Sequence, residues 1–156
     1  MSVIEIRGLT KDYGNNKGVF DLDFSIEEGD VFGYLGPNGA GKTTTIRHLM
    51  GCLNPDKGYT KVLGLDARTE AKKIQKRVGY LPGEIAFLEN MTGLEFLKFM
   101  ARMREMKDLS NMNNLIQRLE LDPKGRIRKM SKGMKQKVGL VCALMDDPEV
   151  LILDEP

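Results

Sequence analysis

The sequence contains only two cysteines among its 156 residues, together with one histidine and no tryptophan. Cys52 and Cys142 have no paired spacing and lie in segments that are predicted to be helical or to flank a helix. A disulfide framework is therefore excluded. We expect both thiols to be reduced packing residues of a cytosolic protein.

Long hydrophobic runs are also missing. The longest apolar stretches, around 138–145 and 150–153, are far too short to span a bilayer. The first residues lack a basic segment followed by an apolar run, so they do not predict a secretory signal. Neither sign of charge dominates, because the sequence contains 24 basic and 22 acidic side chains. The net charge of +2 indicates no partner by itself. Any membrane role must come through a partner.

The patterning predicts an α/β protein. A chain of this length can form one domain that buries roughly two-thirds of the surface its unfolded form exposes. Short alternating or apolar segments bounded by turn formers predict strands. These segments are residues 3–6, 19–26, 31–35, 59–63, 78–81 and 150–153. The last of them is wholly apolar, which is typical of a parallel strand buried on both faces.

Helical spacing of apolar residues predicts the remaining elements. One helix follows the glycine-rich turn after residue 35 and ends at Gly51, and a charged surface helix covers residues 69–77. Three more helices follow in succession, which predicts an all-helical insert. The first opens with a Thr92–Glu95 capping box and has Leu94, Leu97, Phe99, Met100 and Met103 on its apolar side, the second spans about 111–120, and the third follows Ser131 and presents Met134, Val138, Val141, Cys142 and Met145.

The glycine-rich turn fits the phosphate-loop pattern G-x-x-x-x-G-K-[ST], between a predicted strand and a predicted helix. Its glycines let backbone N–H groups approach phosphate oxygens, and the helix adds its positive end. The lysine supplies a full charge, and the threonine hydroxyl is placed to ligate Mg²⁺. The predicted ATP-binding residues of this loop are Gly36, Pro37, Asn38, Gly39, Ala40, Gly41, Lys42, Thr43 and Thr44, with Lys42 also catalytic and Thr43 a metal ligand.

Adjacent carboxylates end the apolar strand at 150–153. P-loop ATPases hold Mg²⁺ with an acid in this arrangement, so Asp154 is the predicted metal-side acid. Neighbouring side chains of a strand face opposite ways, which suits Asp154 to orient the metal and Glu155 to activate the attacking water as general base.

The segment 130–137, Met-Ser-Lys-Gly-Met-Lys-Gln-Lys, precedes the acidic strand by one helix and resembles the signature of the ATP-binding-cassette (ABC) family. Lys132 occupies the first of two usual glycine positions, a variant associated with multidrug or ABC-2-type exporters. The resemblance runs over the whole chain. It implies a P-loop NTPase core with a mainly parallel sheet, an N-terminal antiparallel β subdomain and a helical subdomain at about 84–145. It also implies that residues 1–156 form one incomplete nucleotide-binding domain whose C-terminal strands are missing.

The resemblance also implies partners and further site residues. Two such domains face head to tail, so Ser131, a good helix N-cap, and Gly133 would close over ATP held by the other subunit. Tyr13, in the turn before the second strand, would stack on adenine. A membrane-spanning permease subunit would hold the protein at the cytoplasmic face of the membrane, with ATP and Mg²⁺ as cofactors. The basic stretch 124–137 is either a solvated face for the most part or a surface that draws in nucleotide phosphates.

The sequence departs from the family pattern in places. Pro82-Gly83-Glu84 stands where a glutamine is usual, and whether Glu84 replaces it as an oxygen ligand stays open. The family's switch histidine is absent, and His48 is expected to be a surface or packing residue. In such ATPases the strand that follows the acidic one usually inserts between it and the strand before the phosphate loop. Without that strand we expect the isolated chain to be marginally stable, aggregation-prone or completed by another segment, with weak or no hydrolysis.

Three functions fit these observations. The first is the ATP-hydrolysing subunit of an ABC exporter, and for this function we expect no nucleic-acid partner. The second is a soluble ABC ATPase of translation or DNA maintenance, although the second cassette or coiled-coil arms usual there are not seen. The third is a truncated, non-catalytic nucleotide-binding module. The transported substrate, and whether the dimer is homo- or heteromeric, are not encoded in recognisable residues.

Overall fold

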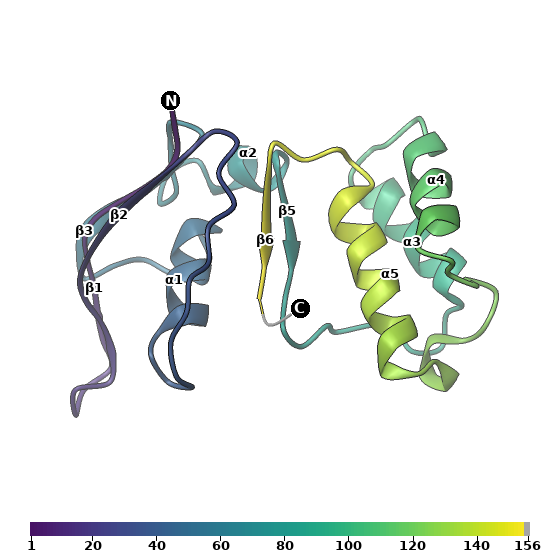
Figure 1. Cartoon of the computed structure of the whole chain (residues 1–156), viewed down its shortest axis with the longest axis horizontal. Coiled ribbons are helices and arrows are strands. Elements are labelled where there is room, and N and C mark those ends of the chain that lie inside the picture. Colours follow the sequence, from purple (N-terminus) through teal and green to yellow (C-terminus); the bar gives the residue numbers. More distant parts are fainter. Residues whose placement is uncertain (155–156) are drawn as a thin grey trace. The chain divides into compact units, whose positions relative to one another are not determined.

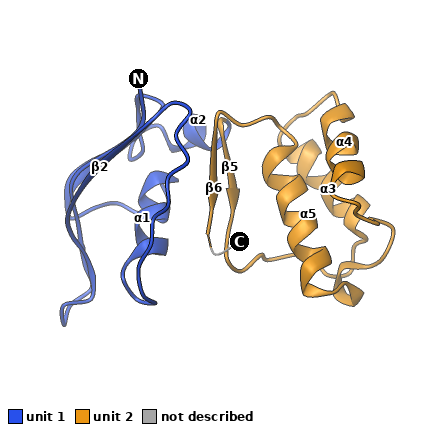
Figure 2. Ribbon diagram, viewed as in Figure 1, with its two compact units in different colours: residues 1–76 blue, residues 77–156 orange. Residues whose placement is uncertain are grey.

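The computed structural model describes residues 1–154 and divides into two units, Met1–Lys76 and Arg77–Pro156, each of which is described by itself (Figures 1 and 2). The first unit is an antiparallel sheet with helices. The second combines a parallel strand pair with a group of helices.

The sheet of the first unit has the strand order β2-β1-β3-β4. Its strands are β1 (Ser2–Asp12), β2 (Gly18–Glu27), β3 (Lys57–Val62) and β4 (Leu65–Asp66). Ile6 of the central strand β1 pairs with Phe24 of β2 on one side and with Thr60 of β3 on the other. The inward residues Ile6, Leu9 and Val62 have no exposed surface, so this sheet carries the unit's core.

Two helices complete the first unit. The helix α1 (Lys42–Leu49) directs Ile46, His48 and Leu49 into the core. It ends as predicted, because Gly51 takes the left-handed backbone with φ 66° that terminates a helix. The helix α2 (Ala71–Gln75) is shorter than the predicted span of 69–77 and has Ile74 fully buried.

The strand predicted at residues 31–35 is wrong, because the segment is not a strand in the structure. A strand needs a hydrogen-bonded neighbour, and among the described residues no sheet includes this segment. Val31 and Leu35 are 102% and 91% exposed, so the apolar run is not buried in the described chain. Aromatic packing holds it instead: Phe32 stacks on Phe24 of β2, with 5.2 Å between ring centroids.

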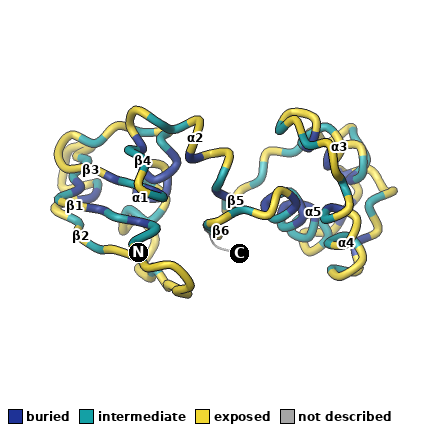
Figure 3. The backbone as a smooth tube through the Cα atoms, turned by 90° about the horizontal axis from the view of Figure 1, so that it is seen from above, coloured by how far each residue is buried: buried dark blue, intermediate teal, exposed yellow. Residues whose placement is uncertain are grey.

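In the second unit, β5 (Val78–Leu81) pairs in parallel with β6 (Val150–Leu153). The helices are α3 (Gly93–Met103), α4 (Ser110–Arg118), the 3₁₀ turn η1 (Ile127–Lys129) and α5 (Lys132–Leu144). α5 packs closely on β5, since a β-carbon at Gly79 would lie 2.2 Å from the Ala143 carbonyl oxygen. Figure 3 shows the buried stretches of α5 in dark blue.

The predicted helical group is confirmed in most details. Thr92 and Glu95 form the capping box, with N···O distances of 2.8 and 3.2 Å. Val138 and Val141 of α5 are fully buried, as the spacing predicted. In α3, however, Met103 is 68% exposed, and Phe96 is the buried residue that the pattern missed. The buried face of α3 therefore includes Phe96 and excludes Met103, which differs slightly from the predicted apolar side.

The prediction that β6 is buried on both faces is wrong. Leu151 and Leu153 are 40% and 39% exposed, whereas Val150 and Ile152 are less so. Within the described residues β6 pairs only with β5, and α5 packs against β5. The outer face of β6 is therefore not covered by the second unit.

Both cysteines are free thiols, as expected. Cys142 is half-buried, and its burial raises the pKa of the thiol. Cys52 is exposed, so the packing role predicted for it is wrong: it follows Gly51, where the chain has already left the buried face of α1.

His48 generates a prediction about stability. The side chain is 1% exposed, and its Nδ1 lies 2.8 Å from the Thr44 carbonyl oxygen. Burial lowers the pKa of His48 below its ordinary value, and the hydrogen bond to Thr44 opposes this in part. The unfolded chain therefore binds more protons below about pH 6.5, so stability is lost as the pH falls through that value.

We expect the free energy of unfolding, measured by urea titration, to decrease from about pH 7.5 to about pH 5.5. A His48→Leu variant should show a flatter profile, because the side chain that takes up the proton is gone. Equal pH dependence in the two proteins would contradict the assignment.

Candidate phosphate-binding site

The loop from Gly36 to Gly41 joins the segment 31–35 to α1 and depends on two left-handed glycines. Gly39 has φ 85° and Gly41 has φ 87°. A β-carbon at Gly41 would lie 2.5 Å from the Val19 side chain, so only glycine fits there. A β-carbon at Gly39 would meet nothing within 4 Å, so this side of the loop is open. The loop is therefore backed by β2 at one end and accessible at its crown.

The helix α1 begins directly after the loop. Gly41 is its N-cap and makes no side-chain capping bond, and the first turn contains no acidic residue. The N–H groups in the first turn of a helix have no intrahelical acceptor, and the helix dipole makes this end positive. Such an end binds anions without further adjustment.

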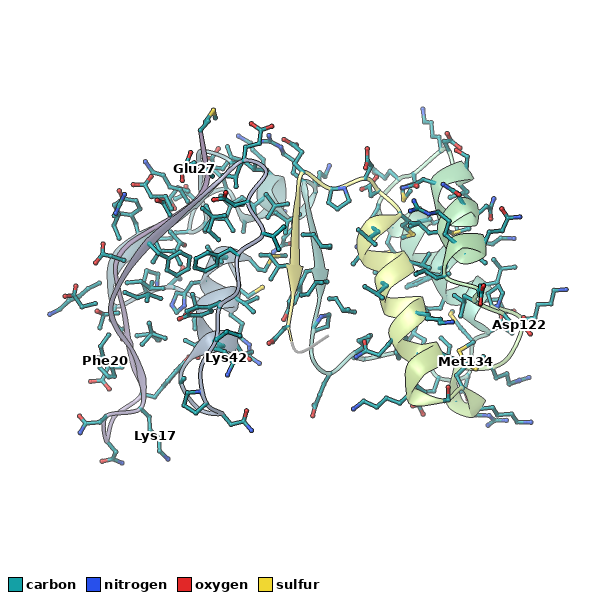
Figure 4. The ribbon with its side chains drawn as sticks, in the orientation of Figure 1. Lys17, Phe20, Glu27, Lys42, Asp122 and Met134 are labelled. Carbon is teal, nitrogen blue, oxygen red and sulfur yellow. The ribbon has the colours of Figure 1, made fainter. Side chains whose placement is uncertain are left out.

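Lys42 adds a full positive charge to the same place. Its ammonium donates hydrogen bonds to the carbonyl oxygens of Pro37, at 3.0 Å, and of Gly36. Figure 4 shows this side chain at the loop end of α1. The ammonium thus lies over the loop and could exchange these carbonyls for phosphate oxygens. The binding of ATP phosphates by Lys42 stays a prediction.

The donor set fits a triphosphate. An open left-handed glycine, an uncapped helix start and an ammonium converge on one loop, and Asn38, Ala40 and Thr43 are exposed there. Within the loop, Ala40 N–H donates to the Pro37 oxygen at 3.1 Å and closes the turn. Thr44 is half-buried, and its backbone carbonyl oxygen is the partner of His48 Nδ1. These features favour phosphate over a neutral ligand.

Tyr13 lies in the turn that precedes β2. Its N–H donates to the Lys17 oxygen at 2.8 Å, and its side chain is 55% exposed. The turn leads into Gly18, whose carbonyl oxygen would be 3.1 Å from a β-carbon at Gly41. The strand that follows Tyr13 therefore backs the end of the phosphate loop. An exposed ring on this turn suits stacking on a base, and that role stays a prediction.

The acidic strand end belongs to the second unit. Asp154 is 7% exposed, and its N–H donates to the Leu81 oxygen at 2.9 Å, which continues the β5–β6 pairing. Glu155, the predicted general base, lies outside the described residues. Thr43 and Asp154 belong to different units, so their shared binding of Mg²⁺ stays a prediction.

The signature segment opens α5 as the sequence predicted. Ser131 is the N-cap, and its hydroxyl oxygen accepts the Met134 N–H at 3.2 Å. The hydroxyl keeps its own hydrogen for a further acceptor. Ser131 and Gly133 are both exposed, and a β-carbon at Gly133 would meet only the Ser131 hydroxyl, at 4.0 Å. Both residues are therefore accessible at the start of α5, and their contact with a second subunit's ATP stays a prediction. Glu84, also exposed, is not assigned a role by its surroundings.

Sequence reasoning missed two residues next to the loop. Tyr34 and Thr45 join their hydroxyls at 3.3 Å, and Thr45 also donates to the Gly41 oxygen at 3.0 Å. The signal available was weak: a threonine four residues after a glycine can bond back to its carbonyl. The partner tyrosine could not be paired with it without the fold.

The sequence profile described as "ABC transporter" matches residues 19–156. The Bacitracin transport ATP-binding protein BcrA of Bacillus licheniformis is 37% identical over 157 residues, which cover 99% of this chain and 51% of BcrA. The Daunorubicin resistance ATP-binding protein DrrA3 of Streptomyces coeruleorubidus is 37% identical over 160 residues, again 99% of this chain and 51% of that protein. The chain thus spans about half the length of these relatives.

The fold has a close counterpart among solved structures. One described as "Structure of ATP binding subunit of ABC transporter" superposes with a TM-score of 0.83 and 29% identity, covering 97% of this chain and 65% of that one. The expected fold class, an α/β nucleotide-binding core with an antiparallel β region and added helices, is confirmed by this match.

The cap at Ser131 can be tested through stability. Ser131→Ala leaves the Met134 N–H without its acceptor, and we expect a loss of about 1 kcal/mol in the free energy of unfolding. Ser131→Asp supplies a carboxylate to the same N–H and should restore most of that loss. Chemical denaturation followed by circular dichroism measures both. Equal stability of the alanine variant and the wild type would contradict the cap.

Proposed function

Because this chain belongs to the ABC transporter family of ATP-binding proteins, we propose that it binds ATP with Mg²⁺ at residues 36–44 and serves an exporter. The relatives' names mention bacitracin transport and daunorubicin resistance, which are properties of those proteins. The similarity to these relatives supports export as the process that this chain drives by binding nucleotide.

One observation carries the proposal: the ammonium of Lys42 lies over a loop whose open glycine adjoins an uncapped helix start. Positive charge and the positive end of a helix in one place favour a polyanion. Residues at the start of β2 cover the loop at Gly41, so a ligand can approach it from the open side at Gly39. A nucleoside triphosphate, with its phosphates on the loop and its base toward Tyr13, matches this arrangement.

When bound, Mg²⁺ would supply positive charge that offsets the charge of the terminal phosphates. We assign Thr43 and Asp154 to hold it, and Glu155 to accept the proton of the attacking water. Asp154 is suited by its burial at a strand end, where few waters compete for the carboxylate. Hydrolysis in this scheme requires a complete domain and a second copy, or a related chain, that presents Ser131 and Gly133.

The proposed assembly needs a permease. Among residues 1–154 no helix combines the length and apolarity needed to cross a membrane. We propose that a membrane-spanning partner holds the protein at the cytoplasmic face, and that residues 1–156 form part of one nucleotide-binding domain, with its helical subdomain at about 84–145. Exposure of the α5 start supports a role for this surface in closing over a second subunit's nucleotide.

The binding proposal is tested by Lys42→Ala. Without the ammonium the phosphate charge loses its partner, so ATP affinity should fall by about 2–5 kcal/mol. Calorimetric titration with Mg-ATP measures the change. The matched control is Lys98→Ala, which removes an exposed lysine of α3 and should leave affinity unaltered. Near-normal ATP affinity in the Lys42 variant would refute the proposal.

The adenine contact is tested by Tyr13→Ala. Loss of stacking on one base should cost about 1–3 kcal/mol and weaken ATP and GTP alike, since every base has a π-face. Tyr13→Phe keeps the ring and should bind as the wild type does. If the alanine variant binds both nucleotides normally, Tyr13 is a simple turn residue.

A further inference from the structure

Two hydroxyl groups connect the segment before the phosphate loop with the helix after it. The Tyr34 hydroxyl lies 3.3 Å from the hydroxyl oxygen of Thr45. The same Thr45 oxygen lies 3.0 Å from the Gly41 carbonyl oxygen. Thr45 is 1% exposed, so water competes little for these contacts. The three groups form a chain that spans the base of the loop.

The direction of this chain follows from counting protons. A carbonyl oxygen can only accept, so Thr45 must donate its single hydroxyl proton to Gly41. Thr45 then has only lone pairs left for its other neighbour, and Tyr34 must be the donor. The order is Tyr34 to Thr45 to Gly41, and each bond polarises the next.

The peptide unit at the end of the chain is the one that matters for a ligand. Its carbonyl belongs to Gly41 and its N–H to Lys42, the first residue of α1. Because a peptide is planar and trans, fixing the direction of the carbonyl fixes the N–H on the opposite side. The Gly41 carbonyl oxygen also accepts the Thr45 backbone N–H at 2.9 Å, so the hydroxyl chain adds a second donor to an oxygen at the start of α1. Gly41 itself has φ 87° and no side chain that could hold this peptide from the other side.

The tyrosine is itself held from the sheet. Its ring lies 5.6 Å from that of Phe24 on β2, and Phe24 stacks on Phe32 at 5.2 Å. The segment that carries Tyr34 belongs to no strand pair among the described residues. These aromatic contacts therefore fix where the hydroxyl reaches.

We propose that Tyr34 is a positioning residue for phosphate binding: through Thr45 it orients the Gly41–Lys42 peptide so that the Lys42 N–H faces the loop's ligand. This inference rests on the proposed ATP-binding function. The proposed role concerns phosphate recognition alone. A change at Tyr34 should therefore alter the binding of ATP and leave the binding of the base unaltered. A residue that merely stabilised the unit would affect both parts equally.

The test is Tyr34→Phe, which removes one hydroxyl and keeps the ring. In ¹⁵N–¹H spectra of the nucleotide-free chain, the Lys42 amide signal should move. Affinity for Mg-ATP should fall about two- to fivefold, the low end for a hydrogen bond because 3.3 Å is long. Affinity for adenosine should stay the same. Tyr59→Phe is the matched control: it removes a hydroxyl that donates to Glu5 at 2.9 Å on the sheet, and should change neither signal nor affinity.

Thr45 provides a second route to the same result. Thr45→Val keeps the shape and removes the relay, so it should weaken Mg-ATP binding, and adding Tyr34→Phe should weaken it no further. Thr45→Ser retains the hydroxyl and should bind as the wild type does. If Tyr34→Phe loses the wild-type circular dichroism spectrum, the comparison of valine with serine decides.

The outcomes separate this inference from the function on which it rests. If the wild type binds Mg-ATP, Lys42→Ala weakens that binding, and Tyr34→Phe changes neither affinity nor the Lys42 signal, the positioning role is overturned and the function stands. Equal losses for Mg-ATP and adenosine would also overturn it. A wild-type chain that binds no nucleotide overturns both.

Discussion

The close approach of Gly41 to the start of β2 is the constraint on which the site depends. No β-carbon fits there, and the left-handed backbone turns the chain from the loop into α1 within one residue. That turn sets where the helix begins and therefore where its positive end lies. Lys42 follows directly and lays its ammonium over the loop. The ammonium, the helix start and the open glycine lie together because the backbone position of Gly41 is fixed.

Much of this was encoded locally. The spacing of glycines, lysine and threonine predicted the loop, Thr92 and Glu95 predicted a capped helix, and Ser131 predicted another. Each of these patterns acts within a few residues, so no tertiary contact is needed to recognise it. The signature segment likewise predicted the family, which the match over residues 19–156 confirms. The ligand roles of these residues were predicted too and await measurement.

What failed depended on neighbours. Residues 31–35 and β6 both have strand-like sequences, but a strand forms and is buried only where another element pairs with it or covers it. In the described chain the first remains unpaired, and Leu151 and Leu153 of the second remain partly exposed. The Tyr34–Thr45 contact was not predicted, because it depends on tertiary packing of Tyr34 against Phe24 of β2. Its residues carry no motif.

The most direct measurement is a titration of the ¹⁵N-labelled chain with Mg-ATP, followed through the backbone amides. The account predicts saturable shifts confined to the loop and first turn of α1, residues 36–44, with AMP producing much smaller ones. Amides of α4, in the other unit, should stay in place. A folded sample in which the loop amides do not respond to ATP would contradict the account.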